Sequence, residues 1–202
     1  MKKLIFALLS GLPACSYALP QTVYDGYPGY YQTLNGIFKG KASFRFDGGR
    51  NPFVYWQGRR FELSDAKAFP REQTRNDDLG TRAKAYEKFP YACVEGQSSS
   101  GSGTADRYWS VYLLDARVAR KIAIYKLPSL FASCAAVRVD KHGRPLFYDA
   151  DYIYANGSDS PAGLSLREFL IDRGEFVLTG HSVTTRFVEA DNVWKFEVKD
   201  VR

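Results

Sequence analysis

The sequence predicts a mainly β protein, either an antiparallel β-sandwich or a partly open β-barrel, with one or two short helices. Polar and apolar residues alternate in many short runs, as they do in strands with one buried face. Turn-forming residues separate these runs at short intervals. The chain also holds 14 Tyr, 14 Phe and 3 Trp against a single Met, and aromatic residues favour strands.

Eleven runs carry the strand pattern. In chain order they are residues 42–46, 53–57, 60–63, 91–97, 107–114, 121–127, 135–140, 145–154, 164–171, 175–179 and 193–199. Four antiparallel hairpins follow from the turn residues between neighbouring runs. Their turns are expected at Gly58, 98–104, 141–144 and 172–174.

Helical signals are scarce. Residues 78–88 begin with an acidic residue and contain good helix formers, so we predict a helix that ends before Pro90. A second short helix is expected within residues 30–38.

The N-terminus has the order of features of a secretory signal. Lys2 and Lys3 precede the apolar run 4–9, which is too short to span a bilayer, and Ser16-Tyr17-Ala18 offers small residues for cleavage before Leu19. We therefore predict a signal peptide over 1–18. An irregular Tyr/Gly/Pro-rich segment over 19–40 and a single β-rich domain over 41–202 would follow it.

A lipoprotein signal is the alternative for the same region. Residues 12–15 read Leu-Pro-Ala-Cys, and acylation of Cys15 would anchor the domain to a membrane. The shortness of the signal is typical of bacteria. The expected location is therefore the periplasm or the medium, with membrane attachment only through Cys15.

Cleavage after Ala18 leaves two cysteines, Cys93 and Cys134. In an oxidising compartment an isolated pair predicts one disulfide, and two free buried thiols are the alternative. The net charge of the whole chain is +6, and the signal accounts for two lysines. A mildly basic exported domain favours anionic envelope polymers or an acidic partner, and the charge gives no indication of nucleic-acid binding.

The sequence predicts no catalytic residue, no metal site and no cofactor. Its two histidines, His142 and His181, are far apart and are both expected in loops, so neither suits a catalytic triad or a zinc site. The Ser/Gly-rich stretch 98–104 lacks the following Gly-Lys-Ser/Thr of a phosphate-binding loop. A flexible hairpin loop is the simpler interpretation.

Asp149 and Asp151 are the strongest catalytic alternative. On an extended strand they share one face about 7 Å apart, a separation found in inverting glycosidases. They would also suit a calcium site. Because Tyr148, Ala150 and Tyr152 form a plausible packing face, the aspartates are equally explained as the solvated side of the strand.

Tyr108 and Trp109 are the predicted binding residues. They begin a strand beside the Ser/Gly-rich stretch, and exposed aromatic side chains often anchor a partner. Trp109 shares a face with Val111 and Leu113, so its side chain is expected in the hydrophobic core. Tyr108 is then the better candidate for a surface binding residue.

The segment 91–96 (Tyr-Ala-Cys-Val-Glu-Gly) resembles the Tyr-x-Cys-x-x-Gly opening of periplasmic inhibitors of C-type lysozyme. That resemblance implies a small disulfide-bearing β-barrel that inhibits an envelope hydrolase. This sequence departs from the family's inhibitory Ser-Gly-x-x-Tyr loop, because the corresponding stretch, residues 102–108, is two residues longer than that motif.

Three functions are therefore weighed. The first is a non-enzymatic periplasmic binding protein that recognises another protein, such as an inhibitor of an envelope hydrolase or an immunity protein to a secreted toxin. The second is an envelope glycan hydrolase or glycan-binding enzyme that uses Asp149 and Asp151. The third is a structural subunit of an envelope assembly, suggested by the composition of residues 19–40.

Overall fold

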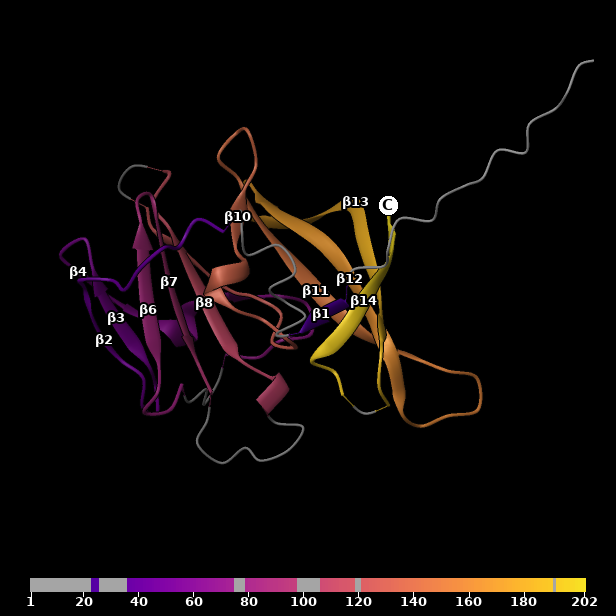
Figure 1. Ribbon diagram of the computed structural model, residues 1–202. Helices are drawn as coiled ribbons and strands as arrows, with labels where there is room; N and C mark the ends of the chain where they lie inside the picture. Colours follow the sequence, from indigo (N-terminus) through magenta and orange to yellow (C-terminus); the bar gives the residue numbers. More distant parts are fainter. Residues whose placement is uncertain (1–22, 26–35, 75–78, 98–105, 119–120, 191) are drawn as a thin grey trace, which may run out of the picture.

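The computed structural model describes residues 23–25, 36–74, 79–97, 106–118, 121–190 and 192–202. Over these ranges the protein is mainly β, as predicted, and its strands form three sheets (Figure 1). A five-stranded sheet lies in the middle of the molecule. A three-stranded sheet packs on one face of it, and a curled six-stranded sheet that forms half of a barrel packs on the other.

The three-stranded sheet holds β2 (Arg45–Asp47), β3 (Phe53–Trp56) and β4 (Arg59–Glu62). In spatial order the central sheet holds β5 (Lys67–Ala68), β9 (Ala123–Lys126), β8 (Ser110–Asp115), β7 (Tyr91–Gly96) and β6 (Lys84–Lys88). The six-stranded sheet holds β1 (Val23–Asp25), β14 (Lys195–Val201), β13 (Glu175–Phe187), β12 (Pro161–Asp172), β11 (Pro145–Tyr154) and β10 (Arg138–Val139). Two short 3-10 helices, η3 (Leu63–Asp65) and η5 (Cys134–Ala136), lie between strands.

All four predicted hairpins are present as antiparallel pairs: β3 with β4, β7 with β8, β10 with β11, and β12 with β13. The first illustrates how the turn residues set the geometry. Gln57 and Gly58 both have positive φ, at 51° and 71°. This is the backbone of a type I′ turn, whose twist matches that of the strands it joins.

The predicted helix over 78–88 is wrong. Residues 84–88 form β6, which pairs antiparallel with β7 from Lys84↔Glu95 to Lys88↔Tyr91. Ala85 is buried against the three-stranded sheet, whereas Tyr86 turns to the other face and donates a hydrogen bond to Glu95. The helix-forming residues of this segment thus follow the period of two that the neighbouring strand imposes, because local propensity is weaker than strand pairing and burial.

The N-terminal segment differs in part from expectation. Residues 23–25, predicted to be irregular, form β1, which pairs with β14 at the edge of the six-stranded sheet. Residues 36–38 are not helical. The signal over 1–18, Cys15, most of the second predicted helix and the stretch 98–104 lie outside the described residues.

The central sheet is buried on both faces, and its two middle strands show why. In β7, Tyr91 and Cys93 join a hydrophobic cluster shared with the six-stranded sheet, while Ala92 and Val94 join a second cluster shared with the three-stranded sheet. Strand β8 divides its apolar side chains in the same way. A strand with two buried faces needs a continuous apolar run, which is what both sequences provide.

A third cluster fills the inside of the curled six-stranded sheet. It contains Leu164, Leu166, Val183 and Phe196, and Phe131 enters it from the segment between β9 and β10. That segment, residues 127–137, is called the connector below because it joins the central sheet to the six-stranded sheet.

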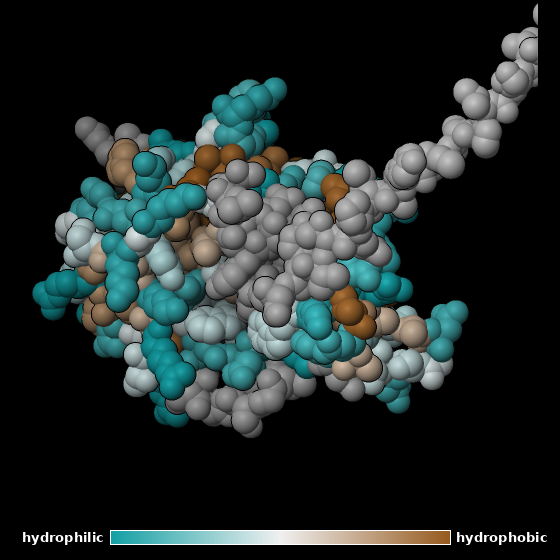
Figure 2. Space-filling model, viewed as in Figure 1, coloured by the Kyte–Doolittle hydropathy of each residue, from teal (hydrophilic) through white to brown (hydrophobic). Residues whose placement is uncertain are grey.

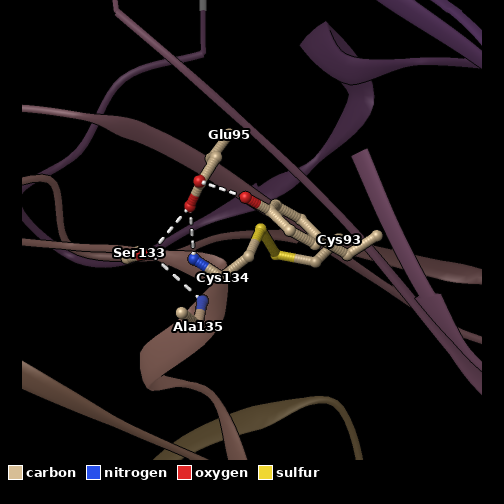
Figure 3. The surroundings of a disulfide bond; sticks show 6 residues. Cys93, Glu95, Ser133, Cys134 and Ala135 are labelled. Carbon is tan, nitrogen blue, oxygen red and sulfur yellow. Dashed lines mark hydrogen bonds between the residues drawn. A yellow bond between two sulfur atoms is a disulfide. The ribbon is translucent and has the colours of Figure 1, made fainter. Parts of the chain in front are cut away.

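The connector is fixed to the central sheet by the disulfide between Cys93 of β7 and Cys134 of η5 (Figure 3). Beside it lies the carboxylate of Glu95, which is only 4% exposed. Glu95 accepts hydrogen bonds from the Ser133 hydroxyl at 2.8 Å, the Cys134 amide at 2.7 Å and the Tyr86 hydroxyl at 2.9 Å. One buried acid and one covalent bond thus hold the same turn.

We expect the double substitution Cys93→Ala, Cys134→Ala to lower the free energy of unfolding by about 4 kcal/mol, because the disulfide closes a loop of sequence separation 41. Urea unfolding at equilibrium measures the change. As a control, the unmodified protein in excess reductant should become as unstable as the double variant. An unmodified protein whose unfolding curve does not respond to reductant would contradict the expectation.

Candidate functional site

A cleft of about 410 Å³ lies between the connector and β11. It brings together residues that the sequence placed in two separate hypotheses, since Tyr108 from the binding hypothesis lies in the same cleft as Asp149 and Asp151 from the catalytic one. The lining residues are Arg71, Glu72, Tyr108, Pro128, Ser129, Leu130, Asp149, Ala150, Asp151, Tyr152 and Tyr154.

The two aspartates share one face of β11, as predicted, and two arginines bind them there. Arg167 comes from the neighbouring strand, where it stands directly opposite Asp149. Arg71 comes from the loop that follows β5. The result is a network of four charged side chains, in which two guanidinium groups and two carboxylates are in direct contact.

The contacts in this four-residue network are short. Arg71 donates to both oxygens of Asp149 at 2.6 and 2.7 Å and to Asp151 Oδ1 at 2.7 Å. A single nitrogen of Arg167 donates to Asp149 Oδ2 at 2.7 Å and to Asp151 Oδ2 at 2.6 Å. The network raises the pKa of Arg71, through its hydrogen bonds to Asp151 first and to Asp149 next. Arg71 therefore stays charged, and the hydrogen bonds hold both guanidinium groups in place.

This geometry suits a structural and binding role better than acid–base catalysis. Two carboxylate oxygens within 2.7 Å of one nitrogen are closer together than the roughly 6.5–9.5 Å of an inverting glycosidase pair. Arginine donors also occupy the oxygens that would have to hold or accept a proton. In the part of the chain that is described, no three His, Cys, Asp or Glu side chains gather as metal ligands would.

Arg71 is positioned by an aromatic cluster two residues earlier in the chain. The ring of Phe69 packs edge-on against Phe147, Phe169 and Phe176, with centroid distances of 5.9, 5.0 and 5.3 Å. These rings come from β11, β12 and β13. Phe69 therefore holds the loop after β5 against the six-stranded sheet. This places Arg71, two residues further on, beside Asp149 and Asp151.

Tyrosines form the rest of the cleft. Tyr108 is 47% exposed and its backbone forms an isolated bridge to Leu130 of the connector. Tyr154 is 54% exposed at the end of β11. Between them, the hydroxyl of Tyr152 accepts a hydrogen bond from Arg107 at 3.0 Å, and burial raises the pKa of this phenol. Trp109, by contrast, packs against the central core, on the face that it shares with Val111 and Leu113.

Neither histidine belongs to the cleft. His142 is exposed in the turn between β10 and β11, as predicted. His181 was expected in a loop and instead lies within β13. The correction follows from the length of β13, which continues eight residues beyond the predicted strand end at Thr179.

Sequence reasoning missed both arginines. Arg167 lies within the predicted strand 164–171, and its position opposite Asp149 would have required the register of β11 and β12, which the loop between them does not fix. Arg71 follows no strand pattern, and its hydrogen bond to Asp151 joins residues 80 positions apart in the chain. No local signal identifies such a residue.

Comparisons of the chain with protein-family models, with characterised proteins and with solved structures find no match. The resemblance of residues 91–96 to lysozyme inhibitors therefore rests on those six residues alone. In the structure all six are buried in β7, so their pattern is accounted for by the core. Within the described ranges, no helix has both the length and the apolar character needed to cross a membrane.

Burial separates the two aspartates and predicts different costs of removing them. The Asp149 side chain is 4% exposed and that of Asp151 is 40% exposed, although both bind the same arginines. We expect Asp149→Asn to lower the free energy of unfolding by about 1–3 kcal/mol, because the buried amide keeps a single acceptor oxygen and turns an NH2 donor toward the arginine donors. Asp151→Asn, the matched control, should cost less than about 1 kcal/mol. Urea unfolding of both variants checks the order, and a larger loss for Asp151→Asn would contradict it.

Proposed function

We propose that this chain is an exported, non-enzymatic binding protein that recognises another protein through the cleft beside Tyr108. The observation that carries the proposal is the presence in one cleft of two exposed tyrosines, Tyr108 and Tyr154, and a half-exposed arginine, Arg71. Tyrosine and arginine are among the residues most enriched at the energetic centres of protein interfaces.

The way Arg71 is held supports this proposal. A free arginine side chain loses rotamer entropy when a partner binds it, which reduces the affinity gained. Here Asp149 and Asp151 fix the guanidinium before any partner arrives. With five N–H donors, the group keeps donor capacity for a partner after these contacts are made.

The face of the molecule in Figure 2 is also consistent with docking through a recess. Among the coloured residues on this face, hydrophilic ones prevail and hydrophobic ones occur in small separate patches. A broad apolar docking surface on this face would form a larger patch. The cleft offers aromatic anchors in a recess, which suits a partner segment that enters it.

The same proposal places the protein in the periplasm or outside the cell. It is supported by the order of features in residues 1–18 and by the disulfide, which is consistent with an oxidising compartment. A partner in that compartment would be an envelope hydrolase or a secreted toxin. The protein would then act as its inhibitor or immunity protein.

Export predicts the N-terminus of the mature protein. When the full chain is expressed in a bacterial host, we expect signal peptidase to cleave after Ala18, so that the purified protein starts at Leu19. Intact-mass spectrometry of the periplasmic fraction measures this. A mature protein that starts at an acylated Cys15 would contradict cleavage after Ala18 and support the lipoprotein alternative. An uncleaved cytoplasmic chain would contradict export altogether.

We expect Tyr108→Ala to weaken partner binding at least tenfold without changing the unfolding temperature, because the side chain is exposed and anchors the cleft. The partner would be captured by crosslinking the tagged protein in its native envelope, and its affinity measured with both purified proteins. Tyr55→Ala is the matched control, since Tyr55 is a 40% exposed tyrosine on the three-stranded sheet. Equal losses in the two variants would contradict the site. Turnover of peptidoglycan that Asp149→Asn abolishes would instead establish the hydrolase.

A further inference from the structure

Among the described strands, none pairs with β11 on its cleft side at Ala150 and Tyr152. On that side β10 pairs with β11 at only two positions, Arg138↔Leu146 and Val139↔Pro145, whereas β11 continues to Tyr154 (Figure 1). On its other side β11 pairs with β12 along nearly its whole length. Among the described strands, none continues β10 beyond Leu146.

The backbone groups on the open edge can be assigned from the alternation of an antiparallel ladder. The amide of Asp140 donates to the carbonyl of Arg144 at 2.9 Å, so even-numbered residues of β11 direct their amides and carbonyls to the β10 side. Ala150 and Tyr152 therefore present their backbone groups to the cleft. No hydrogen bond within the described ranges occupies these groups.

The connector forms the opposite wall of the cleft, and three of its backbone hydrogen bonds are directed away from this edge. Leu127 donates to Val111 at 2.9 Å, the amide of Trp109 donates to Ser129 at 2.9 Å, and Phe131 donates to Arg107 at 2.7 Å. All three bonds point to β8 and the residues before it. A gap remains between the connector and β11, and this gap is the cleft.

We infer that the cleft binds an extended segment of the partner protein, which adds a strand to β11 by pairing with the backbone of Ala150 and Tyr152. Strand addition to an open sheet edge is a common way to recognise a peptide, with affinity from backbone hydrogen bonds and selectivity from alternate side chains. The inference rests on the proposed function and specifies the partner segment and its mode of binding.

The two faces of β11 define the side chains of that segment. One face presents the arginine–aspartate network, in which the side chains of Arg71 and Arg167 are 53% and 43% exposed, that of Asp151 is 40% exposed and that of Asp149 is only 4% exposed. Two exposed guanidinium groups thus stand against one exposed carboxylate, and this excess of positive charge fits an acidic residue. The other face presents Tyr152, with Pro128 and Leu130 across the cleft, and fits an apolar residue. The partner segment should alternate acidic and apolar side chains.

Ala150→Pro tests the backbone pairing directly. Proline lacks the amide hydrogen and is tolerated where that hydrogen faces away from the rest of the sheet. The amide of Ala150 faces the cleft, so the ladder with β12 keeps its hydrogen bonds. Ala150→Gly is the control, because it changes the side chain at the same position but retains the amide hydrogen.

The probe is a phage-displayed library of random eight-residue peptides, selected on the full exported protein. We expect selected peptides to alternate acidic and apolar residues, to bind Ala150→Gly within about threefold of the unmodified protein, and to bind Ala150→Pro at least tenfold more weakly. Amide hydrogen exchange of the unmodified protein provides a second measurement, in which bound peptide should slow exchange at Ala150 and Tyr152. This readout holds even if the proline variant does not fold.

Two results would overturn the inference: no selectable peptide, or peptides that bind without protecting the amides of Ala150 and Tyr152. The proposed function is tested separately, by whether binding of the captured partner depends on Tyr108. A partner that depends on Tyr108 but leaves the β11 amides unprotected would retain the binding protein and reject strand addition. Loss of the Tyr108 dependence would reject the proposed function itself.

Discussion

The arrangement of the two larger sheets depends on the junction between β7 and η5. The disulfide between Cys93 and Cys134 and the buried carboxylate of Glu95 hold the connector against the central sheet. A buried carboxylate is costly unless hydrogen bonds replace its hydration. Glu95 receives three, from two different segments, so the cost of burying it is offset only when the connector sits where it does. The junction thereby selects one path for residues 127–137.

The path of the connector then determines the site. Pro128, Ser129 and Leu130 form one wall of the cleft, and the bridge between Leu130 and Tyr108 sets the position of the exposed tyrosine. The opposite wall is positioned separately, by the packing of Phe69 against three rings of the six-stranded sheet. Because both walls are anchored in buried contacts, the cleft is preorganised, and a partner would not have to order it on binding.

The sequence predicted features that local patterns determine and failed where distant contacts decide. The hairpins were predictable because alternation and turn residues lie within a few positions of each other, as at Gln57-Gly58. Strand β6 was not, because Lys84, Ala85, Glu87 and Lys88 all favour a helix and only pairing with β7 makes them a strand. Within the site, Tyr108 and the shared face of Asp149 and Asp151 followed from local periodicity. Arg71 did not, because its place is set by the packing of Phe69 against aromatic residues that lie about 80 to 110 positions further along the chain.

The open edge of β11 also has to avoid pairing with the wrong strand, since an exposed edge invites aggregation. Here Ala150 is only 5% exposed and lies in a recess that the connector and the arginine–aspartate network also line. Charged side chains that point along an edge are a common protection of this kind. A single extended segment is narrower than a sheet and can enter. The features that protect the edge from indiscriminate pairing are therefore the same ones that would make its recognition selective.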